Sequence, residues 1–165
     1  KGFKENRQIQ FKNDDIELLK KEFGDKIEYL SARIYKNVTA KHKKESGSYN
    51  ARAVHPDHQF LEKTIINEGR YIDNRDIRDR TRVVVIGRLV AQDLFKKEDP
   101  LGKFLILNDI TYKIVGVFSD AGGDNEERMI YLPVSTTQLI HKNTDEIDQI
   151  NVSYNLDLGI PGARK

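Results

Sequence analysis

The clearest pattern of apolar and polar positions lies between residues 81 and 140. A continuous apolar run at residues 83–87 is bounded by polar residues and predicts a strand that is buried on both faces. Residues 89–95 repeat their apolar side chains at spacings of three and four, which predicts an amphipathic helix. Pro100 ends this helix, because the residue before a proline is driven out of helical geometry.

Three more strands are expected after this helix. Residues 104–107 and 112–118 are predicted to be joined by a tight turn at Asn108 and Asp109. A polar, glycine-rich loop at residues 120–128 then leads to a short strand at residues 129–132. Ser135 is predicted to cap the next helix, because Gln138 follows at the spacing of a capping box.

The N-terminal part predicts one helix and a hairpin. Asn13 is a suitable N-cap, acidic residues follow it in the first turn, and Gly24 is the expected C-cap. A strand is expected within residues 26–39, an exposed hairpin loop at residues 41–48 and a returning strand at residues 49–54.

Two polar segments interrupt the remaining pattern. Residues 73–82 alternate positive and negative charges, which predicts a solvated connector and a boundary between lobes. After residue 140 the alternation of Ile150, Val152 and Tyr154 predicts one further half-buried strand.

Five segments in this order resemble the extracytoplasmic core domain of MacB-type, FtsX-like ABC transporter permeases. They are Val-Val-Ile-Gly at 84–87, the apolar pairs within 90–95, Asp-Pro-Leu-Gly-Lys at 99–103, Ile-Val-Gly-Val at 114–117 and Tyr-Leu-Pro-Val-Ser-Thr at 131–136. Asn-Glu-Gly-Arg-Tyr at residues 67–71 resembles the family's glycine-arginine-aromatic element. The structural motif residues are Gly69, Arg70, Gly87, Pro100, Gly102, Gly116 and Pro133.

The pattern and the resemblance together imply an α+β fold with two lobes. Residues 1–72 with 142–165 are expected to form a porter-like α/β lobe, and residues 73–141 a smaller, mixed β-rich lobe inserted into it. In the resembled family a helix and a final strand usually follow the strand near Ile150, and this chain lacks them. The first lobe is therefore expected to be either truncated at its C-terminus or shorter in this member of the family.

Composition narrows the classes of function. The 28 basic and 26 acidic residues leave a net charge of +2, which is too balanced for a generic nucleic-acid binder, so no nucleic acid is expected as a partner. The chain contains no cysteine, so it has no disulfide scaffold and no thiolate metal site. No apolar run approaches the roughly 20 residues of a membrane-spanning helix. Because the chain starts at Lys1 without methionine or signal peptide, we expect a segment of a longer protein.

No residue set predicts a catalytic, cofactor or metal site. Pro56 prevents a continuous helix through His55 and His58, so the histidines are expected to be solvated loop residues rather than zinc ligands. The acidic loop at residues 120–127 does not meet the EF-hand spacing, and a mobile loop is expected there. No phosphate loop or nucleophile elbow is present, so we expect no enzymatic activity in this chain and no bound cofactor.

The candidate partner contacts are basic. They are Lys41, Lys43 and Lys44 in the hairpin loop and Arg75 and Arg78 in the charge run. The hairpin lysines are suited to anionic lipid heads or to a partner protein, with a solvated hairpin tip as the alternative.

The resemblance implies a segment on the periplasmic side of the inner membrane, between the first two membrane helices of a permease. It would transmit the ATP-driven motion of a separate ABC ATPase, for efflux or for lipoprotein or peptide export. The implied partners are the parent membrane helices, the ATPase, a periplasmic adaptor or outer-membrane protein, and a second copy of the chain. The alternative is a freestanding peptide- or lipid-binding module, and chain ends that lie together on one face would favour insertion between membrane helices.

Overall fold

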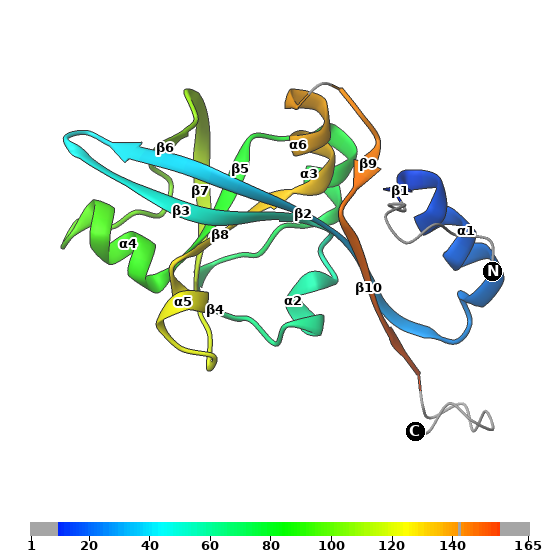
Figure 1. The fold of residues 1–165 in the computed structure, drawn as a ribbon. Helices are drawn as coiled ribbons and strands as arrows, with labels where there is room; N and C mark the ends of the chain where they lie inside the picture. Colours follow the sequence, from blue (N-terminus) through cyan, green and yellow to red (C-terminus); the bar gives the residue numbers. More distant parts are fainter. Residues whose placement is uncertain (1–9, 142, 156–165) are drawn as a thin grey trace, which may run out of the picture.

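A computed structural model describes residues 10–141 and 143–155 of the chain (Figure 1). It confirms a fold that mixes helices and strands. The strands are β1 (Phe11–Lys12), β2 (Ile27–His42), β3 (Glu45–Val54), β4 (Ile65–Gly69), β5 (Val83–Gly87), β6 (Phe104–Leu107), β7 (Ile110–Ser119), β8 (Met129–Pro133), β9 (Glu146–Ile147) and β10 (Gln149–Tyr154). The helices are α1 (Asn13–Phe23), α2 (His58–Leu61), α3 (Asn74–Asp79), α4 (Arg88–Phe95), α5 (Asp124–Glu127) and α6 (Val134–Ile140).

The strands close into a ring that the sequence did not predict. Within the described residues, backbone pairing runs from β2 to β3, β8, β5, β7 and β6, and β6 pairs with β2 again. β10 extends the sheet beside β2, and β4 extends it beside β7. The centre of the fold is therefore a small barrel, and closure leaves only β10 and β4 as edges of this sheet.

β5 has the double burial that its apolar run predicted. Val84 and Ile86 belong to the main core cluster, together with residues of the other barrel strands. Val85 lies on the opposite face of the strand and packs in a second cluster with Phe118 and Tyr131. Because apolar side chains cover both faces, the strand has no polar alternation.

β2 joins the two ends of the molecule. It contains 16 residues, and at about 3.3 Å per residue it extends over roughly 50 Å. Its first part, up to Arg33, pairs with β10, and its second part pairs with β3 and, near its end, with β6. Figure 1 shows β2 running from the side of α1 to the β2–β3 turn at the opposite end.

The β2–β3 hairpin is confirmed, but the predicted loop at residues 41–48 is wrong. β2 continues to His42, β3 begins at Glu45, and only Lys43 and Lys44 form the turn. The polar residues that suggested a loop are exposed positions of two barrel strands, where polar side chains face water. The predicted tight turn at Asn108 and Asp109 is confirmed, and both residues have positive φ angles, of 48° and 71°.

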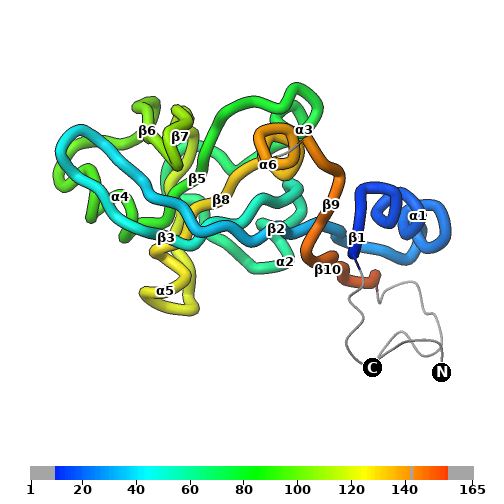
Figure 2. Tube along the Cα trace, turned by 45° about the horizontal axis from the view of Figure 1, so that its top comes forward, coloured from blue at the N-terminus to red at the C-terminus, as the bar shows by residue number. Residues whose placement is uncertain are grey.

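The helices agree with the predictions except in details. α1 covers the predicted region, and Gly24 occupies its C-cap position. The predicted cap by Asn13 is wrong: Lys12 is the N-cap residue, and the Asn13 side chain instead accepts from Gln138 at 2.8 Å. Phe23 is 42% exposed and does not join the buried stripe. The predicted cap by Ser135 is wrong: α6 begins at Val134 with Pro133 as its N-cap residue. The Ser135 hydroxyl instead donates to the carbonyl oxygen of Ile77 at 2.6 Å, because α3 packs beside α6 (Figure 2).

The strand predicted around Ile150 is confirmed as β10, next to β2. Strands of both predicted lobes share one sheet, so strand pairing does not separate the lobes. The division into residues 1–72 with 142–165 and residues 73–141 stays a prediction, as does the truncation of the first lobe. Both chain ends lie outside the described residues.

Candidate functional site

The β2–β3 turn is a basic projection that is held against the end of α4. Its exposed lysines are Lys41, Lys43 and Lys44. The ring of His42 stacks on Phe95 with the ring centroids 3.8 Å apart. His42 Nε2 and Lys43 Nζ lie 3.0 Å and 3.1 Å from the two carboxylate oxygens of Glu98. These two bonds hold the pKa of Glu98 below its ordinary value and fix the turn in place.

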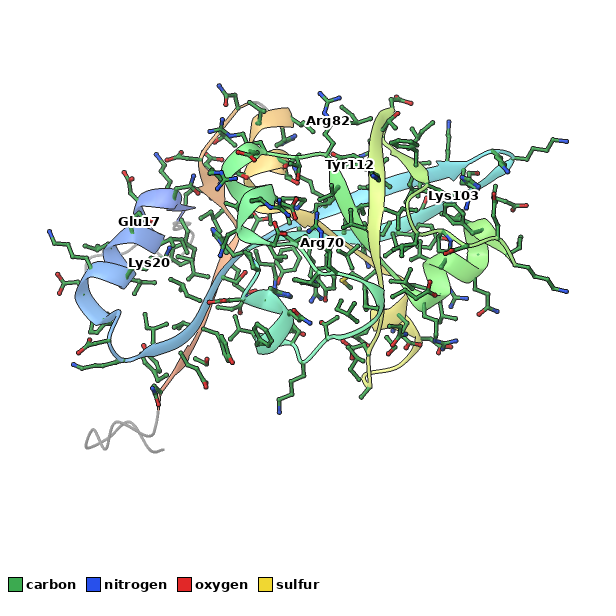
Figure 3. All side chains as sticks on the ribbon, turned by 180° about the vertical axis from the view of Figure 1, so that it is seen from behind. Glu17, Lys20, Arg70, Arg82, Lys103 and Tyr112 are labelled. Carbon is green, nitrogen blue, oxygen red and sulfur yellow. The ribbon has the colours of Figure 1, made fainter. Side chains whose placement is uncertain are left out.

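An apolar and basic surface lies next to this turn on the outer side of the barrel. Phe104 is 59% exposed and Ile106 is 39% exposed, both on β6. Strand pairing places Ile106 opposite Lys41 and Phe104 opposite Lys113, so these four side chains share one face. We call them the tip face. Figure 3 shows Lys103, which precedes β6, toward this end of the molecule.

The tip face was not identified from the sequence. The run Phe-Leu-Ile-Leu at residues 104–107 was predicted as a strand without assigning its faces, and in the structure Leu105 and Leu107 are buried while Phe104 and Ile106 are exposed. The available signal was the shortness of the run together with the lysines that flank it. An exposed apolar pair beside two cations is suited to a partner surface that is apolar with an acidic rim.

The other predicted contact residues, Arg75 and Arg78, lie on α3, away from the hairpin turn in both views (Figures 1 and 2). Arg78 Nε donates to Asp79 at 3.0 Å, and Arg75 lies 3.8 Å from Asp73. The structure therefore does not bring these arginines together with the hairpin lysines. A contact between either basic group and a partner stays a prediction.

The charge run contains a buried ionic cluster, so the predicted solvated connector is wrong here. Asp76 is only 2% exposed. It accepts hydrogen bonds from Arg70 Nη1 at 2.7 Å, from the Thr81 hydroxyl at 2.6 Å and from the backbone N–H of Asp73 at 2.9 Å. Burial by itself would raise the pKa of Asp76, but the bonds from these three groups outweigh burial and lower it. The cluster fixes α3 against the segment just after β4, where Arg70 lies (Figure 3).

A second buried polar cluster surrounds His58, which is completely buried. His58 Nε2 accepts from Nε and Nη2 of Arg33 at 3.1 Å and 2.9 Å, and the Tyr71 hydroxyl lies 3.4 Å from Nδ1. Arg33 also donates to Glu62 and to Gln149, each at 2.9 Å. Because Glu62 follows α2 and Gln149 belongs to β10, this arginine ties both elements to β2. Burial and the charge of Arg33 lower the pKa of His58 to about 3.

The prediction that the histidines are solvated is therefore wrong for His58, and His55 is largely buried as well. His55 Nδ1 accepts from the backbone N–H of Ala32 at 3.0 Å, and burial lowers the pKa of His55 to about 4. Each of these imidazoles uses a ring nitrogen that a metal would need. Among the described residues, no three His, Cys, Asp or Glu side chains are placed to hold a metal ion.

The acidic loop after β7 contains a short helix, α5, which the sequence did not predict. Glu127 is 7% exposed, accepts from Arg88 Nη2 at 2.7 Å and from the backbone N–H of Asp120 at 3.1 Å. Hydrogen bonds from Arg88 and from the Asp120 backbone lower the pKa of Glu127. A Cβ at Gly87 would lie 2.1 Å from the Glu127 carbonyl oxygen. The glycine therefore allows α5 to pack directly on the end of β5.

The motif glycines Gly69 and Gly116 face each other where β4 pairs with β7. Gly69 has a φ of 72°, and a Cβ on Gly116 would lie 2.0 Å from the carbonyl oxygen of Arg70. Two backbones thus approach more closely here than a side chain allows. Pro100 is buried, and its carbonyl accepts from Lys103 N–H at 3.0 Å, which forms the corner at Gly102 before β6. These motif residues serve strand and corner geometry.

A family model and several curated proteins match this chain in sequence. A family model described as the MacB-like periplasmic core domain matches residues 2–157. The macrolide export ATP-binding/permease protein MacB of Wolinella succinogenes is 29% identical over 108 residues, which cover 63% of this chain and 17% of that protein. The pyoverdine export ATP-binding/permease protein PvdT of Pseudomonas aeruginosa is 30% identical over 78 residues, which cover 45% of this chain and 12% of that protein. The chain spans less than a fifth of the length of these curated relatives.

Two solved structures share the fold. The periplasmic region of MacB from Actinobacillus actinomycetemcomitans has a TM-score of 0.81 at 24% identity, over 93% of this chain and 69% of that chain. The extracellular domain of the noncanonic ABC-type transporter YknZ from Gram-positive bacteria has a TM-score of 0.77 at 21% identity, over 88% of this chain and 74% of that chain. None of the described helices is long and apolar enough to cross a membrane.

Proposed function

Because the chain belongs to the family of MacB-like periplasmic core domains, we propose that it transmits ATP-driven motion of an ABC transporter on the outer side of the inner membrane. In this proposal the segment is held by the membrane helices of its parent permease, and the ATPase lies on another domain or subunit. Catalysis and nucleotide binding belong to that ATPase, and this chain works as a mechanical part for efflux or for lipoprotein or peptide export.

The observation that carries the proposal is the continuity of β2. One strand pairs with β10 near α1, forms a wall of the barrel and ends at the hairpin turn. Arg33 supports its middle through a buried hydrogen bond to His58 of α2 and a partly buried one to Gln149 of β10. A hydrogen-bonded strand inside a packed core moves as a unit, so displacement at one end reaches the other.

The placement of the terminal strands supports the same proposal. β1 and β10, the first and last described strands, both lie on the α1 side of the molecule, opposite the hairpin turn (Figures 1 and 2). A domain inserted between two membrane helices would have its attachment points on one side. The tip face would then point away from the membrane, where a periplasmic adaptor, an outer-membrane protein or a second copy of the chain could contact it.

The alternative of a freestanding peptide- or lipid-binding module has less support. A hollow of about 500 Å³ beside α6 is lined mostly by polar side chains such as Arg80, Gln138 and Asp145. Lipid sites and most ligand pockets are mainly apolar and measure roughly 300–1,000 Å³. The mainly apolar hollow at the barrel mouth measures about 100 Å³, which is too small for a lipid or a peptide. The transmission role is therefore the function that the geometry supports best.

The test is a distance measurement in the full-length parent transporter in lipid nanodiscs. This chain contains no cysteine, so after replacement of any cysteines elsewhere in the parent, spin labels can be attached at Lys44→Cys in the turn and Glu28→Cys near the start of β2. We expect the Lys44 label to shift relative to a label on a membrane helix when ATP is added. We expect the distance between Lys44 and Glu28, measured after dilution with unlabelled copies, to stay constant. A turn that keeps its position during active turnover, or a Glu28–Lys44 distance that changes with nucleotide, would contradict the proposal.

A further inference from the structure

Two small hollows meet beside α6 at one mouth of the barrel. The first, about 100 Å³, lies between β2, the β6–β7 turn and α6, and the second, about 110 Å³, lies between β2, α6 and β9. Lys36, Thr137 and His141 line both hollows. The shared residues place the two hollows side by side, and we call the pair together the α6 groove.

The first hollow forms the apolar end of the α6 groove, and its volume suits an aliphatic side chain. Its apolar lining consists of Val38, Leu107, Ile110, Tyr112, Leu132 and Ile140. Most of these side chains are core residues of the barrel. An aliphatic side chain entering here would therefore extend the existing core rather than contact a polar surface.

Unused polar groups gather where the two hollows join. Thr137 is only 6% exposed, and its Oγ1 has no hydrogen-bond partner among the described residues. Buried hydroxyls are nearly always hydrogen-bonded, so this one lacks a partner that an acceptor group reaching Thr137 from either hollow would supply. The side chains of Lys36 and His141 also have no hydrogen bond or ion pair within the described part of the chain. A cationic amine, an imidazole and a free hydroxyl at one place suit a carboxylate.

The second hollow also carries negative charge, opposite to that of Lys36. Glu146 and Asp148 line it together with the shared residues. Asp148 Oδ2 accepts from the backbone N–H of Tyr35 at 2.8 Å, which fixes this carboxylate and leaves its other oxygen for a ligand. Two carboxylates beside a small hollow favour an ammonium group.

We propose that the α6 groove binds an aliphatic α-amino acid as its zwitterion. The side chain would occupy the apolar hollow, the α-carboxylate would lie by Lys36, Thr137 and His141, and the α-ammonium would face Glu146 and Asp148. The order of apolar, cationic and anionic linings along the groove matches the order of groups in such a molecule. The inference does not depend on the transmission role.

The test is a titration of the 165-residue chain with leucine, followed by amide chemical shifts in NMR spectra. We expect saturable shifts at Lys36, Thr137, His141 and Leu107. Alanine lacks the side chain for the apolar hollow, leucinamide lacks the carboxylate and N-acetyl-leucine lacks the ammonium. Each should bind about tenfold or more weakly, because each loses one of the three matched groups.

Variants locate the binding and separate it from folding. Lys36→Met and Thr137→Val should each weaken leucine binding by about tenfold, which is typical for loss of one hydrogen bond to a charged ligand. Lys113→Met, on the outer face of the barrel, is the matched control and should bind as the original chain does. Amide shifts outside the groove report whether each variant keeps the fold.

Three outcomes would overturn the inference. They are the absence of saturable shifts with leucine, equal binding of leucine and N-acetyl-leucine, and unchanged binding in the two groove variants. Failure of this test leaves the transmission role unaffected, because that role rests on β2 and not on the groove.

Discussion

Replacement of Asp76 by asparagine tests whether the buried ionic cluster holds α3 in place. The carboxylate accepts from Arg70, Thr81 and the backbone N–H of Asp73. An asparagine of the same shape has one oxygen acceptor, and its NH₂ group would face at least one of these donors. The Asp76→Asn variant therefore keeps the volume but leaves donors without a partner.

The expected loss of folding stability is about 2–3 kcal/mol. A buried group that loses its partner costs roughly 1–3 kcal/mol, and a fully broken buried ion pair about 3–5 kcal/mol. The Arg70 side chain is 40% exposed and regains water, which reduces the loss. For a chain of this size, 2–3 kcal/mol corresponds to a decrease in Tm of roughly 4–12 °C.

Urea unfolding followed by circular dichroism and tyrosine fluorescence measures this loss, since the chain has seven tyrosines and no tryptophan. The pH dependence has a defined sign. The folded pKa of Asp76 is lowered, so its contribution is complete above the unfolded pKa of about 3.9 and is lost as pH falls through the folded pKa. The stability difference between the two proteins should stay constant from pH 7 to 5 and shrink below about pH 4.

Asp79→Asn is the matched control. Asp79 lies in the same charge run, and among the described residues its carboxylate forms an ion pair with the exposed Arg78 alone, so its replacement should leave the urea midpoint unchanged. The reasoning is refuted if Asp76→Asn unfolds at the same urea concentration as the original chain, or if its deficit is equal at pH 7 and pH 2.5.

Four further variants test other parts of the fold. Gly116→Ala places a Cβ 2.0 Å from the Arg70 carbonyl oxygen and should lose at least about 2 kcal/mol in urea unfolding, whereas Gly102→Ala meets no atom within 4 Å and should lose about 1 kcal/mol from its positive φ alone. Folded His58 has a pKa of about 3, so its stability contribution is complete above pH 6.5 and falls by about 2 kcal/mol at pH 5. His58→Gln should accordingly show a flatter stability profile between pH 7 and 5, and an equal slope would contradict this. Thr137→Val removes a buried hydroxyl that has no partner among the described residues, so the free energy of unfolding should rise by up to about 1 kcal/mol and the thermal midpoint should rise slightly. A clear decrease in the midpoint would show that the hydroxyl has a partner.

Local pattern was sufficient where a segment's surroundings are simple. The apolar run of β5 predicted a doubly buried strand, and the helix after it begins and ends within one residue of the prediction. The turn at Asn108 and Asp109 was predicted from residue types that tolerate positive φ. In each case the residues that determine the geometry are neighbours in the sequence.

The pairing of strands that are far apart in the chain could not be predicted from the sequence. β3 runs parallel to β8 although more than 70 residues separate them, and nothing in either strand specifies that register. The closed ring follows from such non-local pairings. Without the ring, polar residues on the outer face of β2 and β3 suggested a loop.

The buried polar clusters were missed for a related reason. Asp76 lies among alternating charges, and such runs are usually solvated. Its burial depends on Arg70, which the turn after β4 places within 2.7 Å. His58 likewise becomes a buried acceptor only because β2 carries Arg33 past it. Three-dimensional packing decides which member of a charge run or which histidine is buried.

The short strand β6 has a consequence for how the barrel can open. β6 pairs with β2 through two residue pairs, Ala40–Leu107 and Lys41–Ile106. Asn108 adds two hydrogen bonds to β2: its backbone N–H donates to the Thr39 carbonyl oxygen, and its Oδ1 accepts from the Thr39 N–H. The Lys41–Ile106 pair lies on the exposed side and the Ala40–Leu107 pair is buried. Because this contact is much shorter than the β2–β3 pairing, it is where the barrel would separate first under load. The two Asn108 bonds therefore help to determine how readily this end of the domain could widen without unfolding.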